Sequence, residues 1–232
     1  MELSVKNTIV IIPSYNEEST IANIIQDIIK IGLFVLVIDD GSIDNTFKEA
    51  VASGAKVLKN KKNKGKGFSI IRSINYVLQE TSYEWVVIMD GDGQHDVKDI
   101  YKFLNLMQQE NVDIIIGNRM LNVKNMPIVR YFTNLLTSWI ISILCKQSIS
   151  DVQCGYRAIN RKILEKMDLK CFNYDIESEM LIQAAQYDAK IKSVTIQTIY
   201  GDEVSKINPI VDTFRFIFLI FKYIFVIKKK NK

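Results

Sequence analysis

The first half of the chain alternates short apolar runs with segments that have the hydrophobic spacing of helices. Residues 8–12 form a β-branched run that stops at Pro13, and isoleucines recur at helical spacing over residues 21–29. Similar patterns predict strands at residues 33–38, 56–58, 85–89 and 112–116 and helices at residues 45–52, 68–78 and 97–109. Strands that alternate with helices predict a mixed, mainly parallel sheet with helices on both faces.

The second half of the chain has longer apolar segments. Residues 128–149 predict a long helix, residues 174–187 a second helix and residues 191–200 a strand. The last predicted helix, at residues 209–227, is rich in Phe and Ile, yet it carries three charged side chains and is followed by a lysine-rich end. A spanning helix needs ~20 mostly apolar residues, so this segment is expected to lie in a membrane interface, with a core helix that ends in a solvated tail as the alternative.

Polar clusters follow the predicted strands at their carboxyl ends. Residues 13–17 follow the first strand, residues 39–42 the second, residues 90–94 the fourth and residues 117–119 the fifth. Ligands of parallel α/β sheets bind outside the carboxyl ends of the strands. The clusters are therefore expected to converge on one site.

The cluster after the fourth strand has the chemistry of a metal site. Asp90 and Asp92 flank Gly91, and two carboxylates this close repel each other unless a cation lies between them. Oxygen ligands of this type suit Mg²⁺ or Mn²⁺, and Gln94 can add a carbonyl oxygen. The alternative is an acidic turn that is hydrogen-bonded to its own backbone.

Two further clusters suit a nucleotide. An Asp at the position of Asp39 or Asp40 can bind a ribose or a base, although Asp40 or Ser42 can instead cap the following helix. Residues 63–67, N-K-G-K-G, precede a helix and can favour phosphate, but they are not a P-loop. His95 is the only histidine, and its expected role is structural or that of a single metal ligand.

Composition narrows the classes of protein. The 232 residues carry a net charge of +4, which gives no argument for a nucleic-acid partner. The three cysteines lack metal or disulfide spacing, which favours reduced thiols and a cytoplasmic location.

The order of the motifs carries a family resemblance. V-I-I-P-S-Y-N-E-E, V-I-D-D-G-S-I-D, N-K-G-K-G and M-D-G-D-G-Q-H-D resemble the family 2 glycosyltransferases of the GT-A fold, which is Rossmann-like. The chain looks most like their polyprenol-phosphate sugar transferases, the dolichyl-phosphate mannose synthase type, from about residue 8 to residue 212. The resemblance implies a GT-A catalytic domain at residues 1–208 and an amphipathic membrane-interface helix with a basic tail at residues 209–232.

The resemblance also implies roles for single residues. It places donor binding at Pro13, Tyr15, Asn16, Glu17, Asp39, Asp40, Lys66, Asp90, Asp92 and Lys206. It places metal binding at Asp90, Asp92 and Gln94, and catalysis at Asp92, Asp151, Arg157 and Glu177. Arg119 and Arg130 resemble arginines that hold an acceptor phosphate, with a surface ion pair as the alternative for each. The chain departs from the family pattern at one point: the arginine usually found several residues before Ser205-Lys206 is missing, and Tyr200 stands nearby instead.

The implied activity is inverting, metal-dependent transfer of a sugar from a UDP- or GDP-sugar to a polyprenyl phosphate. It is expected at the cytoplasmic membrane face, with a membrane-protein partner or a homodimer as further expectations. One alternative is a soluble transferase that glycosylates a polysaccharide or protein hydroxyl and uses Glu177, Asp175 or Asp151 as base. The other is an inactive protein that only binds nucleotide sugars.

Overall fold

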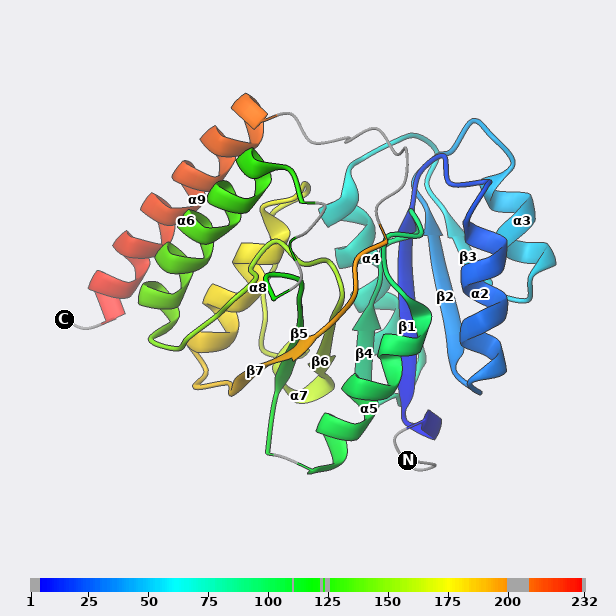
Figure 1. The fold of residues 1–232 in the computed structure, drawn as a ribbon, viewed down its shortest axis with the longest axis horizontal. Helices are drawn as coiled ribbons and strands as arrows, with labels where there is room; N and C mark the ends of the chain where they lie inside the picture. The colour runs from blue at the N-terminus through cyan, green and yellow to red at the C-terminus, as the bar shows by residue number, and fades with distance from the viewer. Residues whose placement is uncertain (1–4, 110, 122, 124–125, 200–208, 231–232) are drawn as a thin grey trace.

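A computed structural model describes residues 5–109, 111–121, 123, 126–199 and 209–230. Within them, seven strands form one mixed sheet in the order β3-β2-β1-β4-β6-β5-β7 (Figure 1). The strands are β1 (Thr8–Ser14), β2 (Phe34–Asp39), β3 (Lys56–Lys59), β4 (Trp85–Ile88), β5 (Ile114–Asn118), β6 (Arg157–Asn160) and β7 (Ile191–Thr195). β6 is antiparallel to both of its neighbours and the other pairings are parallel, which confirms the predicted sheet.

The helices cover this sheet and extend one end of it. They are α2 (Ile21–Lys30), α3 (Thr46–Ala52), α4 (Lys66–Glu80), η1 (Val97–Asp99), α5 (Ile100–Gln109), α6 (Ile128–Cys145), α7 (Arg161–Leu164), α8 (Ile176–Ala185) and α9 (Pro209–Lys230). Figure 1 places α2 and α3 at the end of the sheet that carries β3, and α6, α8 and α9 at the other end. α8 packs against both α6 and α9. The strands β1 and β4, whose apolar residues are mainly Ile and Val, are almost wholly buried, so the sheet is the core.

The structure differs from the predicted elements in three places. Pro13 continues β1 and pairs with Ile38, so the first strand does not stop there. The predicted helix at residues 128–149 ends at Cys145, because Lys146 takes a left-handed conformation with φ 53°. β6 was not predicted, since its four residues include two polar side chains and too few apolar ones for a visible pattern.

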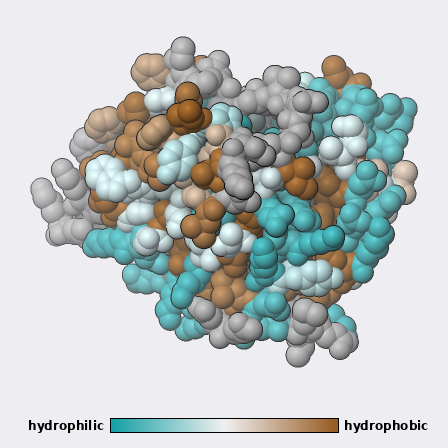
Figure 2. Space-filling view, in the orientation of Figure 1, coloured by the Kyte–Doolittle hydropathy of each residue, from teal (hydrophilic) through white to brown (hydrophobic). Residues whose placement is uncertain are grey.

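Two helices expose apolar side chains to solvent. On α6 the exposed residues include Phe132 and Trp139, and on α9 they include Phe214 and Phe218, which is 74% exposed. Figure 2 shows hydrophobic surface gathered at the end of the molecule where Figure 1 places these helices. By length and composition alone, α6 could cross a membrane, although one face of it packs on α8. Among the described helices, α9 does not pass the same test, in line with its charged residues.

Candidate active site

The predicted clusters converge on one cleft of about 370 Å³ at the carboxyl ends of β1, β2 and β4. Seven predicted site residues line it: Pro13, Tyr15, Glu17, Asp40, Lys66, Asp90 and Asp92. Ser69, Asn173 and Tyr174 line it as well and were not predicted. Asn173 and Tyr174 come from the segment before α8, far away in sequence, so no local pattern marks them as cleft residues.

The loops after β1 and β2 lock each other in place. Asn16 has φ 54°, its backbone N–H donates to Ser42 Oγ at 3.0 Å, and its Oδ1 accepts from Ile43 N at 3.0 Å. The backbone N–H of Glu17 donates to Thr46 Oγ1 at 2.8 Å. Asn16 is not part of the cleft lining, and its hydrogen bonds fix the loop that carries Tyr15 and Glu17; its predicted donor contact stays a prediction.

The two neighbouring aspartates have different surroundings. Asp40 accepts from the backbone N–H of Lys64 at 3.0 Å and of Gly65 at 2.8 Å, and so holds the lysine-rich loop against the cleft. Asp39 is fully buried and accepts from Ser42 N at 2.9 Å. Asp40 therefore lines the cleft and Asp39 does not. The capping alternative is wrong, because the N-cap of α3 is Asn45.

Lys66 is the ionic centre of the cleft. It is the first residue of α4, and its Nζ lies 2.6 Å from Asp90 Oδ1 and 2.8 Å from Glu177 Oε1. Burial alone would lower the pKa of Lys66, but the Asp90 and Glu177 carboxylates raise it far above its usual value. Burial alone would raise the pKa of Asp90, and Lys66 lowers it well below its usual value. Lys66 is therefore a fixed cation.

Two glycines let the backbone approach these charges. A Cβ on Gly91 would lie 2.6 Å from Ser14 Oγ, and a Cβ on Gly155 would overlap the Asp90 carboxylate. Gly155 belongs to D-V-Q-C-G-Y-R-A-I, which brings the loop before β6 against Asp90. No side chain fits between this loop and the ion pair.

Asp92 is the carboxylate best suited to a metal ion. Its Oδ1 accepts from Gln94 N at 3.0 Å, and it forms no ion pair with any residue that the structure describes. Burial, followed by the negative charge of Asp90, raises the pKa of Asp92. A cation would relieve both effects, so the donor set fits Mg²⁺ or Mn²⁺. In the described part of the chain no three His, Cys, Asp or Glu side chains form a metal cage. Mg²⁺ usually keeps several waters and takes substrate phosphate oxygens as further ligands.

The raised pKa of Asp92 predicts the pH dependence of metal binding. The metal binds the ionised carboxylate, so affinity is complete above the pKa and falls as the pH falls through it. The fall should begin at a higher pH than for an ordinary aspartate, with pKa about 3.9. Mn²⁺ titrations of the protein between pH 4 and pH 8 measure this directly. An Mn²⁺ affinity that stays constant until the pH approaches the ordinary aspartate pKa of about 3.9 would contradict the environment described for Asp92.

Three predicted residues lie in buried networks beside the cleft. Arg119 binds Asp151 through Nε at 2.8 Å and Nη2 at 2.8 Å, and Asn134 donates to Asp151 at 2.7 Å. Asp151 is completely buried, and burial would raise its pKa, but Arg119 lowers it. Arg157, 1% exposed, donates to the carbonyls of Val152, Cys154 and Glu177. Asp151 and Arg157 each hold a loop and do not line the cleft, and their catalytic role stays a prediction.

The remaining predicted residues are placed as follows. Arg130 lies in the first turn of α6, half-buried, with no hydrogen bond or ion pair to the described residues. Gln94 does not line the cleft, and its backbone carbonyl accepts from Ile199 N. Asp175 forms no ion pair within the described part of the chain and does not line the cleft. Lys206, Ser205 and Tyr200 lie outside the described residues.

His95 is a buried residue that lies beside the Asp90 carboxylate. It is 5% exposed, its Nε2 lies 3.5 Å from Asp90 Oδ2, and its ring packs on Tyr156 with centroids 5.1 Å apart. These contacts fit a structural role for His95, and the role of a single metal ligand stays a prediction.

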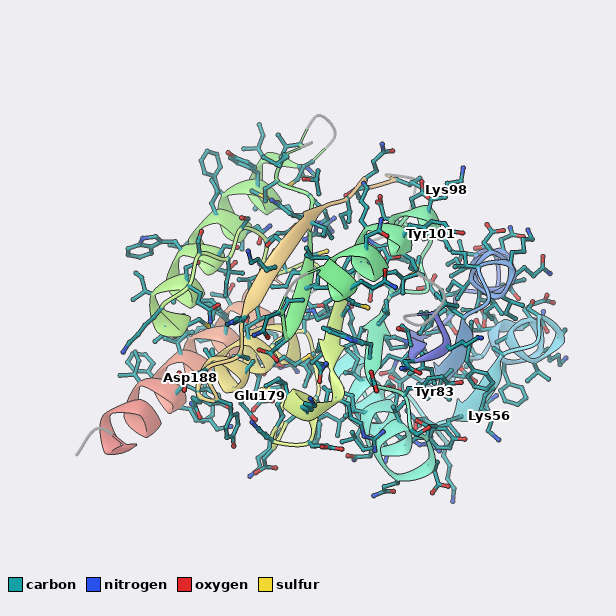
Figure 3. All side chains as sticks on the ribbon, turned by 90° about the horizontal axis from the view of Figure 1, so that it is seen from below. Lys56, Tyr83, Lys98, Tyr101, Glu179 and Asp188 are labelled. Atoms are coloured by element: carbon teal, nitrogen blue, oxygen red, sulfur yellow. The ribbon has the colours of Figure 1, made fainter. Side chains whose placement is uncertain are left out.

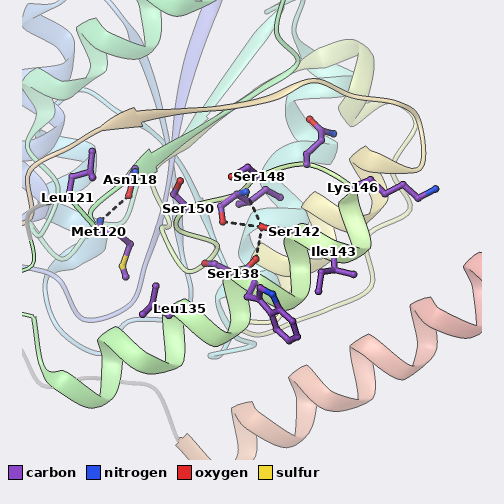
Figure 4. A pocket seen from close by; sticks show the side chains of 13 residues that line it. Asn118, Met120, Leu121, Leu135, Ser138, Ser142, Ile143, Lys146, Ser148 and Ser150 are labelled. Atoms are coloured by element: carbon purple, nitrogen blue, oxygen red, sulfur yellow. Dashed lines mark hydrogen bonds between the residues drawn. The ribbon is translucent and has the colours of Figure 1, made fainter.

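A second, larger hollow of about 690 Å³ lies beside α6 (Figure 4). Leu135, Trp139 and Ile143 contribute apolar side chains to its lining. Ser138 and Ser142 also line it, and their hydroxyls accept from the backbone N–H groups of residues 152 and 149, respectively. It shares no lining residue with the cleft and has no carboxylate in its lining. The ionic chemistry therefore belongs to the smaller cleft.

Comparisons with known proteins agree with this geometry. The sequence model of the family described as Glycosyl transferase family 2 matches residues 9–168. The UDP-N-acetylglucosamine–dolichyl-phosphate N-acetylglucosaminyltransferase of Methanococcus voltae is 31% identical over 215 residues, which cover 83% of this chain and 85% of that protein. The polyprenol monophosphomannose synthase of Mycolicibacterium smegmatis is 29% identical over 189 residues, which cover 74% of this chain and 71% of that protein.

A solved structure is similar as well. Glucosyl-3-phosphoglycerate synthase from Mycobacterium tuberculosis, solved in complex with Mn²⁺, UDP and phosphoglyceric acid, superposes with a TM-score of 0.70. The match covers 88% of this chain and 74% of that one at 20% identity, so it speaks for the fold alone.

Proposed function

This chain belongs to glycosyl transferase family 2, and from that premise we propose that it transfers a sugar from a nucleoside diphosphate sugar to a polyprenyl phosphate at a membrane surface. The family and the seven-stranded sheet confirm the expected GT-A fold and the expected enzyme class, a nucleotide-sugar glycosyltransferase. The acceptor, the metal ion and the membrane are the proposal.

The polyprenyl-phosphate acceptor is proposed mainly from the similarity, over most of the chain, to two enzymes whose names include a polyprenol lipid. One is named for dolichyl phosphate and the other for polyprenol monophosphomannose, and they align with 83% and 74% of this chain. The match to the family model, over residues 9–168, includes the cleft residues from Pro13 to Asp92.

Ion pairing in the site also favours a phosphate acceptor. A hydroxyl acceptor needs a general base, and two of the predicted bases are occupied, Glu177 by Lys66 and Asp151 by Arg119. Asp175 remains as a candidate base but does not line the cleft. A phosphate oxygen is already anionic near neutral pH and needs no base.

Different cleft residues are proposed to bind the metal ion and the nucleoside of the donor. A divalent cation, when bound, would neutralise the charge of the leaving diphosphate, as Lewis acid and template. Asp92 would hold it, with Asp90 kept ionised beside it by Lys66. Pro13 at the end of β1, and Tyr15 and Glu17 in the loop that Asn16 and Ser42 fix, would contact the nucleoside.

Arg130 is proposed to hold the acceptor phosphate, since its guanidinium has no partner in the described part of the chain. Arg130→Ala should raise the acceptor KM about tenfold, the loss of roughly 1.4 kcal/mol of a charge-assisted contact, and leave the donor KM unchanged. Steady-state kinetics with each substrate varied in turn measure both constants. Lys146→Ala, an exposed cation beyond the other end of α6, is the matched control. Equal shifts in both KM values, or none, would contradict the role.

The membrane surface is proposed from the exposed apolar side chains of α6 and α9 and from the lysine-rich end of the sequence. Each lysine near anionic lipid contributes about 1 kcal/mol. Asn134, Thr137 and Ser138 on α6 face the protein core, and α8 packs there, so we propose that α6 lies in the interface and does not span. A membrane-protein partner or a homodimer would have to bury the same apolar side chains.

The choice of acceptor separates this proposal from its rivals. Dolichyl phosphate, dolichol and a soluble oligosaccharide can be compared as acceptors at equal concentration with one active donor. Transfer to the lipid phosphate alone is the expected result. Transfer to the oligosaccharide or to dolichol would mean a hydroxyl acceptor and would direct attention to Asp175 as base.

A further inference from the structure

Glu179 is a buried carboxylate outside the donor cleft that connects three parts of the chain. It lies on α8 and is 0% exposed (Figure 3). Its Oε2 accepts from the backbone N–H of Lys170 and of Cys171, each at 2.8 Å. Its Oε1 accepts from the Tyr223 hydroxyl at 3.1 Å. A buried carboxylate is costly unless such donors satisfy it, so these groups hold one another in place.

The segment that Glu179 holds forms a wall of the donor cleft. The carbonyl of Phe172 accepts from Phe68 N at 3.2 Å. A Cβ on Gly65 would overlap the Phe172 carbonyl, and a Cβ on Gly67 would overlap the Cys171 carbonyl, so this segment lies directly on the start of α4. Tyr174 then lines the cleft, with its ring centroid 5.7 Å from Lys66 Nζ.

The third part is the surface helix α9. Tyr223 is 5% exposed, and its hydroxyl also accepts from Gln183 Nε2 at 2.8 Å. Gln183 in turn accepts from Asp168 N at 2.8 Å, just before the segment that Glu179 holds. Leu219, one turn earlier on α9, is 1% exposed. α9 therefore packs on α8 through a buried hydrogen-bond network of Tyr223, Gln183 and Glu179. The same network binds the backbone of residues 168, 170 and 171, which lead into the cleft wall.

We propose that Glu179 and Tyr223 are positioning residues for the donor, so that the seating of α9 on α8 fixes residues 170–174 and thereby sets donor affinity. This rests on the proposed function, because the cleft must be the donor site. Glu177, which binds Lys66, and Glu179 lie within one turn of α8. A movement of α8 caused by loss of the Tyr223 contact would therefore also move Glu177 relative to Lys66. A residue that only holds the helices together would change stability without changing affinity.

The test uses Tyr223→Phe in the full chain, which removes one hydroxyl and keeps the ring. Binding of UDP and of GDP, each with Mn²⁺, is measured by calorimetry, and hydrogen–deuterium exchange is measured over residues 168–174. The expected result is a three- to tenfold weaker Kd for the nucleotide that binds, with faster exchange of the Lys170 and Cys171 amides. Tyr101→Phe, on the exposed side of α5 (Figure 3), is the matched control and should change neither quantity.

An unchanged Kd for Tyr223→Phe, with exchange like that of the wild type, would overturn the positioning role. Glu179→Gln gives a second reading, because it keeps the shape and removes the charge, and it should weaken the same nucleotide by at least as much. If the wild type bound neither nucleotide, the proposed function would fail, and with it the statement about donor affinity. The exchange measurement would then still show whether Tyr223 and Glu179 hold residues 170–174.

Discussion

Asp92→Asn is expected to lower sugar transfer by about 10²–10³-fold, because it removes the cleft carboxylate that is best suited to hold the metal ion and that forms no ion pair with the described residues. The backbone N–H of Gln94 can still donate to the asparagine side-chain oxygen, so the turn should persist. Stability should therefore change little, and the loss should appear in kcat at saturating donor and metal. Turnover with Mn²⁺ and thermal unfolding, measured on the same preparation, separate the two effects.

Asp96→Asn is the matched control for this experiment. Asp96 belongs to the same polar run, but its carboxylate accepts from Lys98 N at 2.9 Å as the N-cap of η1. Asn is about as good an N-cap as Asp, so activity and stability should stay near those of the wild type. Turnover of Asp92→Asn at the wild-type rate with saturating metal would remove Asp92 from the metal site.

Lys66→Met is expected to destabilise the fold by about 3 kcal/mol and to abolish donor binding. The change leaves Asp90 and Glu177 buried without their shared cation, and breaking a buried pair costs about 3–5 kcal/mol. The lower end of that range is expected, since a carboxylate can take up a proton. The free energy of unfolding in urea measures the effect. Lys30→Met, which breaks an ion pair exposed on both sides, should cost less than about 1 kcal/mol.

A double variant shows whether the charges are the cause. Lys66→Met with Glu177→Gln removes one of the two orphaned carboxylates and should recover about half of the lost stability. Donor binding should stay lost, because Asp90 would still lack its cation. Losses that add in the double variant would mean that Lys66 and Glu177 act independently, contrary to their 2.8 Å contact.

The sequence was most informative about the donor half of the site. Strand ends carry polar residues for a local reason, so the positions of Pro13, Asp40, Asp90 and Asp92 at one edge follow from the alternation of strands and helices alone. The resemblance added the family and the acceptor class. The weaker predictions concerned side chains whose role depends on distant partners.

Arg119 and Asp151 illustrate this limit. Thirty-two positions separate them, and nothing in the local pattern shows that they form a bidentate pair rather than an acceptor site. Tyr174 and Glu179 are similar, since their surroundings come from the start of α4 and from α9. The sequence showed which residues carry charge, and the fold decided which of these charges are paired.

The proposed transfer is measured directly by incubating the protein with radiolabelled UDP- and GDP-sugars and dolichyl or undecaprenyl phosphate in detergent, with Mn²⁺ or with EDTA. A lipid-linked sugar is expected from one donor class with Mn²⁺ and none with EDTA. A product that forms equally well in EDTA would contradict the role of the metal. Transfer only to a hydroxyl acceptor, with the lipid phosphate left unmodified, would contradict the acceptor class.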